Sequence, residues 1–229
     1  MAYYDKYKIT FATKTSKTVY LYLQEDLPSA PTLIEFIGVD ISLSYIPSGD
    51  EIYEAMYASE LSVVMDVTDN LANIPDFVTV NDRKYFVKLF LGSDLEWTGF
   101  TLSDNIQMTY SSGRKQLAFT CVDGLGMLRN IPLNISNVGN RTNSLKSVLE
   151  YILTCLNSLN FPTTPNLMTS CSYYALDMND RGDGTQYEPF SQTYLPLRTF
   201  KNEDYTYENS YDVLDKIVKS FGCRLFQAG

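Results

Sequence analysis

The sequence RKYFVKLFL, from Arg83 to Leu91, shows the alternation that decides the fold of the chain. Large apolar side chains recur here in steps of two. One side of the segment carries Tyr85, Val87, Leu89 and Leu91, and the other carries Phe86, Lys88 and Phe90. A period of two predicts a β-strand whose two faces meet different surroundings.

Two more strands are predicted directly after this one. Beyond a turn at Gly92-Ser93-Asp94, the segment Glu96–Leu102 (EWTGFTL) contains the single tryptophan, Trp97. A long polar stretch then leads into Arg114–Val122 (RKQLAFTCV), which again alternates. The glycines of Asp123-Gly124-Leu125-Gly126 allow a tight corner, because glycine reaches positive φ and permits close backbone approach.

The N-terminal part of the chain continues the same pattern. Together with the segments above, its strands predict a barrel or sandwich in residues 1–133. Gly38 is expected at a bulge or bend of its strand. The predicted strands are Tyr7–Thr13, Thr18–Gln24, Leu33–Tyr45 and Ser59–Val67.

Residues 134–229 change character and predict a second domain with two helices. Leucines and isoleucines at helical spacing place the first helix at Ser144–Leu159, with Asn143 or Ser144 as its N-cap. The second helix is predicted at Tyr211–Phe221, capped by Asn209 or Ser210 and ended by Gly222. The fold class is therefore α+β and mainly β. An apolar strand that begins at Cys223 leads us to expect a longer natural chain.

Composition excludes several classes of function. The net charge of −9 argues against a protein that grips nucleic acid through its phosphates. The absence of histidine removes Ser-His-Asp and Cys-His catalysis and histidine-ligated metals. The four cysteines, Cys121, Cys155, Cys171 and Cys223, form no CxxC pair, so we expect free thiols in a reducing cytoplasm. We expect no cofactor, and neither a signal peptide nor an apolar membrane span is visible.

Three weaker motifs have simpler interpretations. Asp177, Asn179 and Glu188 stand at the first, third and twelfth positions of a calcium-loop pattern, but a cation, Arg181, occupies its fifth position. We therefore expect a solvated acidic loop. Trp97 could serve as a sugar platform, although a core aromatic side chain fits the strand pattern better. Surface carboxylates are expected for Glu35, Asp40, Asp50 and Glu51, because their spacing makes no catalytic pair.

A set of short motifs in a fixed order resembles a known family. The motifs are Asn81–Tyr85 (NDRKY), Glu96–Phe100 (EWTGF), Thr120–Leu128 (TCVDGLGML), Ile131–Leu133 (IPL), Cys155–Asn157 (CLN), Val213-Leu214 and Lys219–Gln227 (KSFGCRLFQ). With these motifs in this order, the chain looks like the N-terminal part of large tail proteins from phages and prophages of Bacteroides-type bacteria, which are similar to baseplate hub and tail-tip hub proteins.

The resemblance implies a tube-forming β-barrel and a structural virion protein of the tail tip. Such a protein is not an enzyme. It joins the tail tube to the receptor-binding apparatus, partners with copies of itself in a ring, and lets DNA pass without specific binding. A trimer is favoured and a hexameric distal-tail ring is the alternative. A carbohydrate-binding or adhesin module of a tail is a further alternative. Acidic residues would line the channel, and the candidates are Asp40, Asp50, Glu51, Glu60 and Asp66.

The calcium interpretation has a direct test. We expect millimolar calcium to leave the melting temperature of the protein unchanged, because the loop from Asp177 to Glu188 lacks an oxygen ligand at Arg181. Differential scanning fluorimetry with calcium, and with magnesium as a control, measures this. A rise in melting temperature that Glu188→Gln abolishes would establish a calcium site instead.

Overall fold

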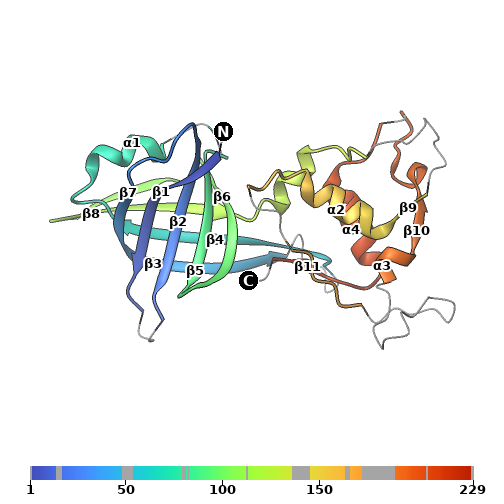
Figure 1. The fold of residues 1–229 in the computed structure, drawn as a ribbon, viewed down its shortest axis with the longest axis horizontal. Coiled ribbons are helices and arrows are strands. Elements are labelled where there is room, and N and C mark those ends of the chain that lie inside the picture. The colour runs from blue at the N-terminus through green and yellow to red at the C-terminus, as the bar shows by residue number, and fades with distance from the viewer. Residues whose placement is uncertain are drawn as a thin grey trace. The chain divides into compact units, whose positions relative to one another are not determined.

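The computed structural model divides the chain into two compact units (Figure 1). It describes residues 2–13, 17–47, 54–78, 81, 83–111, 113–135, 145–162, 166–171, 189–204 and 206–227. The first unit comprises Met1–Ile46, Tyr57–Gly124 and Phe226–Gly229, and the second comprises Pro47–Met56 and Leu125–Leu225. The domain boundary predicted after Leu133 lies inside the second unit, because the chain leaves the first unit already at Gly124.

The first unit is a closed seven-stranded β-barrel, and the protein is mainly β, as the sequence predicts. Around the barrel the order is β4-β3-β1-β2-β5-β6-β8, and pairing of β4 with β8 closes it. Strands β1 and β3 run parallel. The barrel strands are β1 (Ala2–Phe11), β2 (Val19–Leu27), β3 (Ile34–Pro47), β4 (Met56–Asp66), β5 (Tyr85–Leu91), β6 (Asp94–Thr101) and β8 (Arg114–Val122).

The strands predicted from two-residue alternation are confirmed. Strand β8 has the predicted bounds, and β5 and β6 differ from prediction by two residues or fewer at each end. The predicted polar stretch before β8 contains a further strand, β7 (Gln107–Ser111), which pairs with β8. Its sequence QMTYS is short and mostly polar, so alternation could not identify it. A short strand near the C-terminus, β11 (Leu225–Phe226), pairs with β4.

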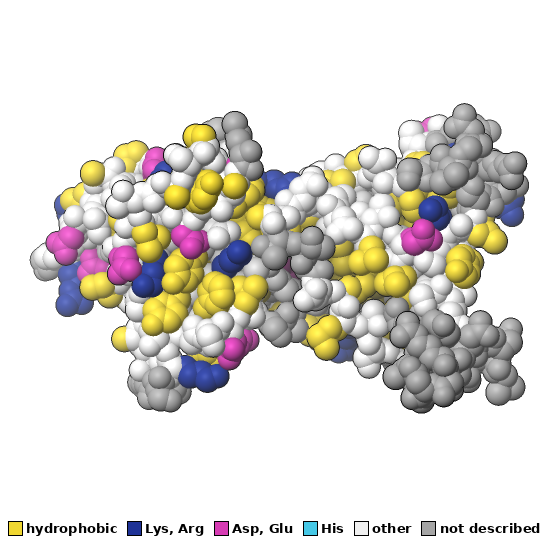
Figure 2. Space-filling model, in the orientation of Figure 1, with side chains coloured by type: hydrophobic (Ala, Val, Ile, Leu, Met, Phe, Trp, Pro, Cys, Tyr) yellow, Lys and Arg dark blue, Asp and Glu magenta, His cyan; other side chains and the backbone are white. Residues whose placement is uncertain are grey.

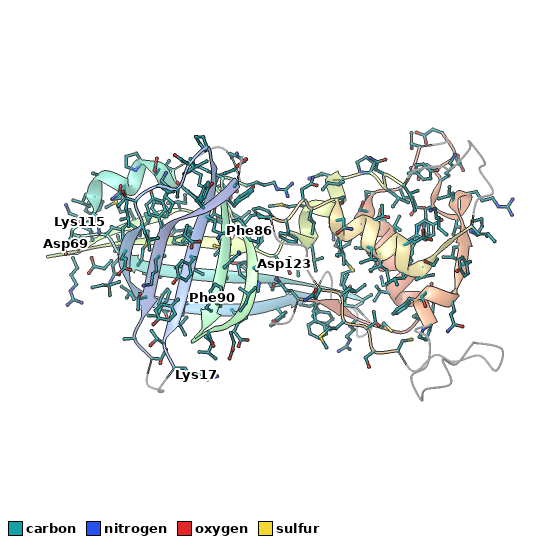
Figure 3. All side chains as sticks on the ribbon, in the orientation of Figure 1. Lys17, Asp69, Phe86, Phe90, Lys115 and Asp123 are labelled. Carbon is teal, nitrogen blue, oxygen red and sulfur yellow. The ribbon has the colours of Figure 1, made fainter. Side chains whose placement is uncertain are left out.

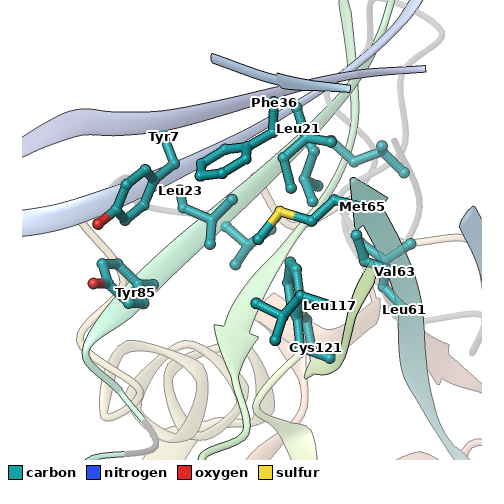
Figure 4. Close-up of a cluster of buried hydrophobic side chains, with 14 of the residues drawn as sticks. Tyr7, Leu21, Leu23, Phe36, Leu61, Val63, Met65, Tyr85, Leu117 and Cys121 are labelled. Carbon is teal, nitrogen blue, oxygen red and sulfur yellow. The ribbon is translucent and has the colours of Figure 1, made fainter. Parts of the chain in front are cut away.

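The barrel interior is filled by side chains (Figure 4). Gly38 allows one close contact, because a Cβ there would lie 2.2 Å from the ring of Phe11. Phe36 and Ile41 both pack towards the core although they are an odd number of residues apart. The alternation of β3 therefore changes between them, in agreement with the irregularity expected near Gly38. Fully buried members of the core include Tyr7, Ile9, Leu21, Leu23, Leu61, Met65, Val87, Leu117 and Cys121.

A short helical segment, η1 (Leu71–Asn73) and α1 (Ile74–Phe77), packs against the same core. The ring of Phe77 stacks on that of Tyr7, with the ring centres 4.8 Å apart. The neighbouring Asp76 carboxylate accepts hydrogen bonds from Lys6 Nζ at 2.6 Å and from the Tyr7 hydroxyl at 2.8 Å. The bond from Lys6 lowers the pKa of Asp76. Phe77 and Asp76 thus attach this segment to the barrel.

The second unit contains the two predicted helices, and the start of the first one was predicted wrongly. Helix α2 spans Val148–Asn157, not Ser144–Leu159. Leu145–Ser147 forms strand β9, which pairs with β10 (Tyr194–Pro196). Ser147 is the N-cap, since its side chain accepts from Glu150 N while the Glu150 carboxylate accepts from Ser147 N. This reciprocal capping box begins the helix four residues later than predicted.

Helix α4 spans Ser210–Ser220 and confirms the second helix prediction to within one residue at each end. Its N-cap is Asn209, whose side chain accepts from Asp212 N. Gly222 follows the helix with φ of +62°, a value that suits glycine after a helix end. Helices α2 and α4 pack on each other. The remaining short segments of this unit are η2 (Leu125–Asn130), α3 (Pro189–Gln192) and η4 (Leu197–Phe200).

The packing of α2 predicts a contrast between two adjacent residues. Ile152 is 4% exposed, whereas Leu153 on the same helix is 37% exposed. We expect Ile152→Ala to lower the free energy of unfolding by about 2–5 kcal/mol, because it leaves a cavity. Leu153→Ala is the matched control and is expected to cost about 1 kcal/mol or less. Denaturant titration measures both, and equal costs would contradict the assignment of the buried face.

Candidate assembly surface

The outward side chains on one half of the barrel differ in character from those on the other half. On β2 and β5 the odd-numbered residues fill the core, so the even-numbered residues point outward. The register places Phe86 beside Gln24 and Phe100, and Phe90 beside Tyr20. We call the outward side chains of β1, β2, β5 and β6 the aromatic face, which contains the partly exposed rings of Tyr20, Tyr22 and Phe90. Phe86 and Phe100 lie on the same side of the sheet but are fully buried.

One row of this face continues onto β3 and is mostly apolar, with Thr10 as its polar member. Successive pairings join Ile37 to Thr10, Thr10 to Tyr20, Tyr20 to Phe90, and Phe90 to Leu95. Ile37 is 71% exposed and Leu95 is 40% exposed, so both ends of the row meet solvent. Exposed apolar side chains of this kind are typical of surfaces that proteins use for contacts.

A shallow groove lies on the same face. Figure 2 shows hydrophobic side chains gathered on the front of the barrel, and Figure 3 labels Phe90 there. The rings of Tyr22 and Phe90 meet edge to face, with centres 5.7 Å apart. Gln24 Nε2 donates to the Asp5 carboxylate at 2.7 Å. The groove, of about 370 Å³, is lined by Asp5, Tyr20, Tyr22, Gln24, Lys88, Phe90, Gly92 and Ser93.

The outward residues of β3, β4 and β8 have a different character. On β4 and β8 these outward side chains alternate with buried residues. On β3 they alternate with Ile41, which packs towards the core. These described residues include acidic, small and uncharged polar side chains, together with Arg114 at the start of β8 and the apolar Ile46, Val64 and Val122. We call this surface the acidic face, and it contains Asp40, Ser42, Glu60, Ser62, Asp66, Gln116 and Thr120.

Three predicted channel residues lie on the acidic face: Asp40, Glu60 and Asp66. Asp66 is fixed in place, since its carboxylate accepts from Thr68 N at 2.9 Å and from Thr68 Oγ1 at 2.6 Å. These bonds lower the pKa of Asp66, with a smaller contribution from the charge of Arg114. These hydrogen bonds favour the charged form of the Asp66 carboxylate. The other two candidates, Asp50 and Glu51, lie outside the described residues.

Trp97 belongs to the interior and supplies no exposed sugar platform. It is 1% exposed, and its indole N–H donates to Ser59 Oγ at 2.7 Å. The hydroxyl of Ser59 in turn donates to the buried Asp123 carboxylate at 2.8 Å, and Ser59 N donates to the same oxygen at 2.6 Å. Figure 3 marks Asp123 at the end of β8. The expectation of a core tryptophan is confirmed, and the alternative of Trp97 as an exposed platform is wrong.

The other sequence candidates provide no chemical site in the described part of the chain. Asp177, Asn179 and Glu188 lie outside it. Within it, no cluster of three or more potential metal-binding side chains occurs, and no helix combines the length and hydrophobicity of a membrane span. No disulfide joins the cysteines: Cys121 and Cys155 are buried, and Cys171 and Cys223 are partly exposed.

Comparison with known proteins gives one distant structural similarity to report. No protein-family model matches the chain, and no curated protein matches it. A crystal structure of the prophage MuSo2 43 kDa tail protein from Shewanella oneidensis aligns with a TM-score of 0.36 and 13% identity. The alignment covers 79% of this chain and 50% of that protein, so the chain spans half the length of the protein that it matches. Similarity at this level does not establish a common fold.

The burial of Trp97 predicts its fluorescence. Because this residue is the single tryptophan and is bonded inside the barrel, we expect blue-shifted emission and weak quenching by acrylamide. Both properties should change when the protein unfolds. Added saccharides should leave the emission unchanged. Strong acrylamide quenching of the folded protein would show that Trp97 is exposed and would contradict its placement in the core.

Proposed function

We propose that this chain is a structural protein of a phage tail, a virion component acting at the tail tip as part of the baseplate hub or tail-tip hub. The observation that carries the proposal is the division of the barrel surface into an aromatic face and an acidic face. The ordered motifs that resemble tail-tip proteins support it independently. The proposed role is mechanical, so it requires neither a catalytic residue nor a cofactor.

The packed interior determines where a DNA channel could lie. Fully buried side chains such as Leu21, Leu61 and Leu117 fill the barrel, which leaves no passage through it. A channel for DNA must therefore be formed between several copies of the chain. Head-to-tail contacts between identical subunits close into a ring when the rotation between neighbours closes. We propose such a ring, with a trimer favoured over a hexamer.

The two faces take complementary roles in this ring. Asp40, Glu60 and Asp66 would face the channel, because negative charge repels the phosphates of passing DNA and the small neighbours of these residues offer little to bind. The aromatic face would contact a neighbouring copy or the tail tube. Tyrosine and phenylalanine are enriched at protein interfaces, and burying the row from Ile37 to Leu95 would remove apolar area from water.

A second candidate function, carbohydrate binding, is favoured by the groove. Tyr22 and Phe90 offer apolar rings, while Lys88 and the bonded pair of Asp5 and Gln24 offer polar contacts beside them. A cavity lined by aromatic rings and a few polar groups is a common ligand site. Retention on immobilised host polysaccharide that Tyr22→Ala abolishes would move the assignment towards an adhesin.

The ring proposal predicts that Ile37→Asp abolishes assembly. Ile37 is 71% exposed, so the substitution spares the core but places a charge in the apolar row. Tyr110→Asp is the matched control, because Tyr110 is 70% exposed on β7, outside the aromatic face. Analytical ultracentrifugation should show a ring for the wild type and the control, and a monomer for Ile37→Asp.

Electron microscopy of the assembled particle tests the assignment of the faces. A central channel about 20 Å wide or more, with Asp40, Glu60 and Asp66 on its wall, is the expected result. A monomeric wild type at high protein concentration would contradict the ring. A channel lined by lysine and arginine, or one lined by the aromatic face, would contradict the roles proposed for the two surfaces.

A further inference from the structure

The short helical segment Leu71–Phe77, which comprises η1 and α1, covers aromatic rings of the barrel core. Phe77 is its one buried side chain, and no side chain caps the start of either helix. The rings around Phe77, all with centres within 6.1 Å of its own, are those of Tyr7, Phe36, Tyr85 and Phe119. The segment therefore covers a large apolar surface although few buried contacts hold it.

Side chains of the barrel converge on Asp76, the residue before Phe77. Its carboxylate accepts hydrogen bonds from Lys6 Nζ at 2.6 Å and from the Tyr7 hydroxyl at 2.8 Å. Its backbone carbonyl accepts from Lys84 Nζ at 3.0 Å and from the Tyr85 hydroxyl at 3.1 Å. Figure 4 shows Tyr7 and Tyr85 beside each other, with ring centres 5.8 Å apart. Donors from β1 and from the start of β5 thus hold one residue of the segment.

A second carboxylate faces the same two lysines. Glu25 on β2 lies 2.6 Å from Lys6 Nζ and 4.0 Å from Lys84 Nζ. Lys84 Nζ also lies 3.7 Å from an oxygen of the Asp76 carboxylate. Of these charged groups, only Asp76 belongs to the segment. We call this cluster the Asp76 latch, and it comprises Asp76, Lys6, Tyr7, Glu25, Lys84 and Tyr85.

We propose that the Asp76 latch is acid-sensitive, so that protonation of Asp76 lets the segment Leu71–Phe77 open while the barrel stays folded. A charged carboxylate attracts both ammonium groups, and a neutral carboxyl group loses this attraction. No described strand pairing includes the segment, so its opening breaks no ladder of the barrel. Opening would withdraw Phe77 and expose the rings that it covers. Local opening of this kind occurs where few buried contacts hold a segment.

The direction of the pH dependence follows from the contacts of Asp76. The hydrogen bond from Lys6 lowers its pKa, and the bond from Tyr7 and the charge of Lys84 act in the same direction, although partial burial opposes them. In the open segment the carboxyl group regains the ordinary aspartate pKa of about 3.9. The latch therefore holds fully above this pH, and its contribution is lost as the pH falls through the lowered value. The segment stays closed at neutral pH.

Hydrogen exchange of the folded full chain, from neutral pH down to about pH 3, tests the proposal. Exchange rates are corrected for the intrinsic effect of pH. Protection of the segment should fall below about pH 3.9, by up to tenfold for each unit by which the latch lowers the pKa of Asp76. Protection of β2 and β8 and the blue-shifted emission of Trp97 should remain. Binding of a dye specific for apolar surface should rise over the same range.

Asp76→Asn removes the charge and keeps the size of the side chain. It should lower protection of the segment already at neutral pH, and acid should then have little further effect. Asp94→Asn is the matched control, because Asp94 begins β6 outside the segment with its side chain 65% exposed. The control should keep the pH dependence of the wild type.

If Asp76→Asn does not fold, the pH series of the wild type decides the question alone. Unchanged protection of the segment in acid would overturn the proposal. Loss of protection in β2 and β8 over the same pH range would also overturn it, because the barrel would then unfold as a whole. So would a pH dependence that Asp76→Asn retains. None of these outcomes depends on the proposed function or on whether the chain forms a ring.

Discussion

Closure of the barrel through the pairing of β4 with β8 is the constraint on which the rest of the first unit depends. Once the sheet is closed, each strand residue faces either a filled core or the outside. The even-numbered residues of β5 cannot enter the core without moving Val87 and Leu89 out of it, because a shift of one residue exchanges the two faces. The outward aromatic side chains are therefore a fixed property of the fold.

Much of this architecture could be predicted from the sequence, because the strands have one strongly apolar side. Strand β8 is the clearest case, with Leu117, Phe119 and Cys121 all turned inward. Strand β7 could not be predicted, since Met108 is its one apolar residue packed against the core. The start of α2 was misplaced because Leu145 fits the helical spacing, although it is 61% exposed in β9. The local signal that decides the start is the pairing of Ser147 with Glu150.

The candidate surfaces were only partly visible in the sequence for a different reason. Asp40, Glu60 and Asp66 could be proposed as channel residues one by one, but their common face follows from long-range register and from the change of alternation in β3. The apolar row from Ile37 to Leu95 likewise comes from four strand pairings. Its one local signal was Phe90, an apolar residue on the outward side of β5. Trp97 was ambiguous because only Ser59 and Asp123, distant in the sequence, determine its burial.

The path of the chain also explains why no single boundary separates the two units. The chain leaves the first unit between β3 and β4, leaves it again after Gly124, and returns to pair β11 with β4. Cutting the chain after Leu133 would not leave the first unit intact. The cut would also remove Phe226 of β11, whose ring contacts that of Tyr45. Strand β8 pairs with β4 from Glu60 onward, and the C-terminal strand adds a hydrogen bond from Leu225 N to Ala55 O, next to the start of β4. The barrel closes without β11, and this C-terminal strand is an addition to β4.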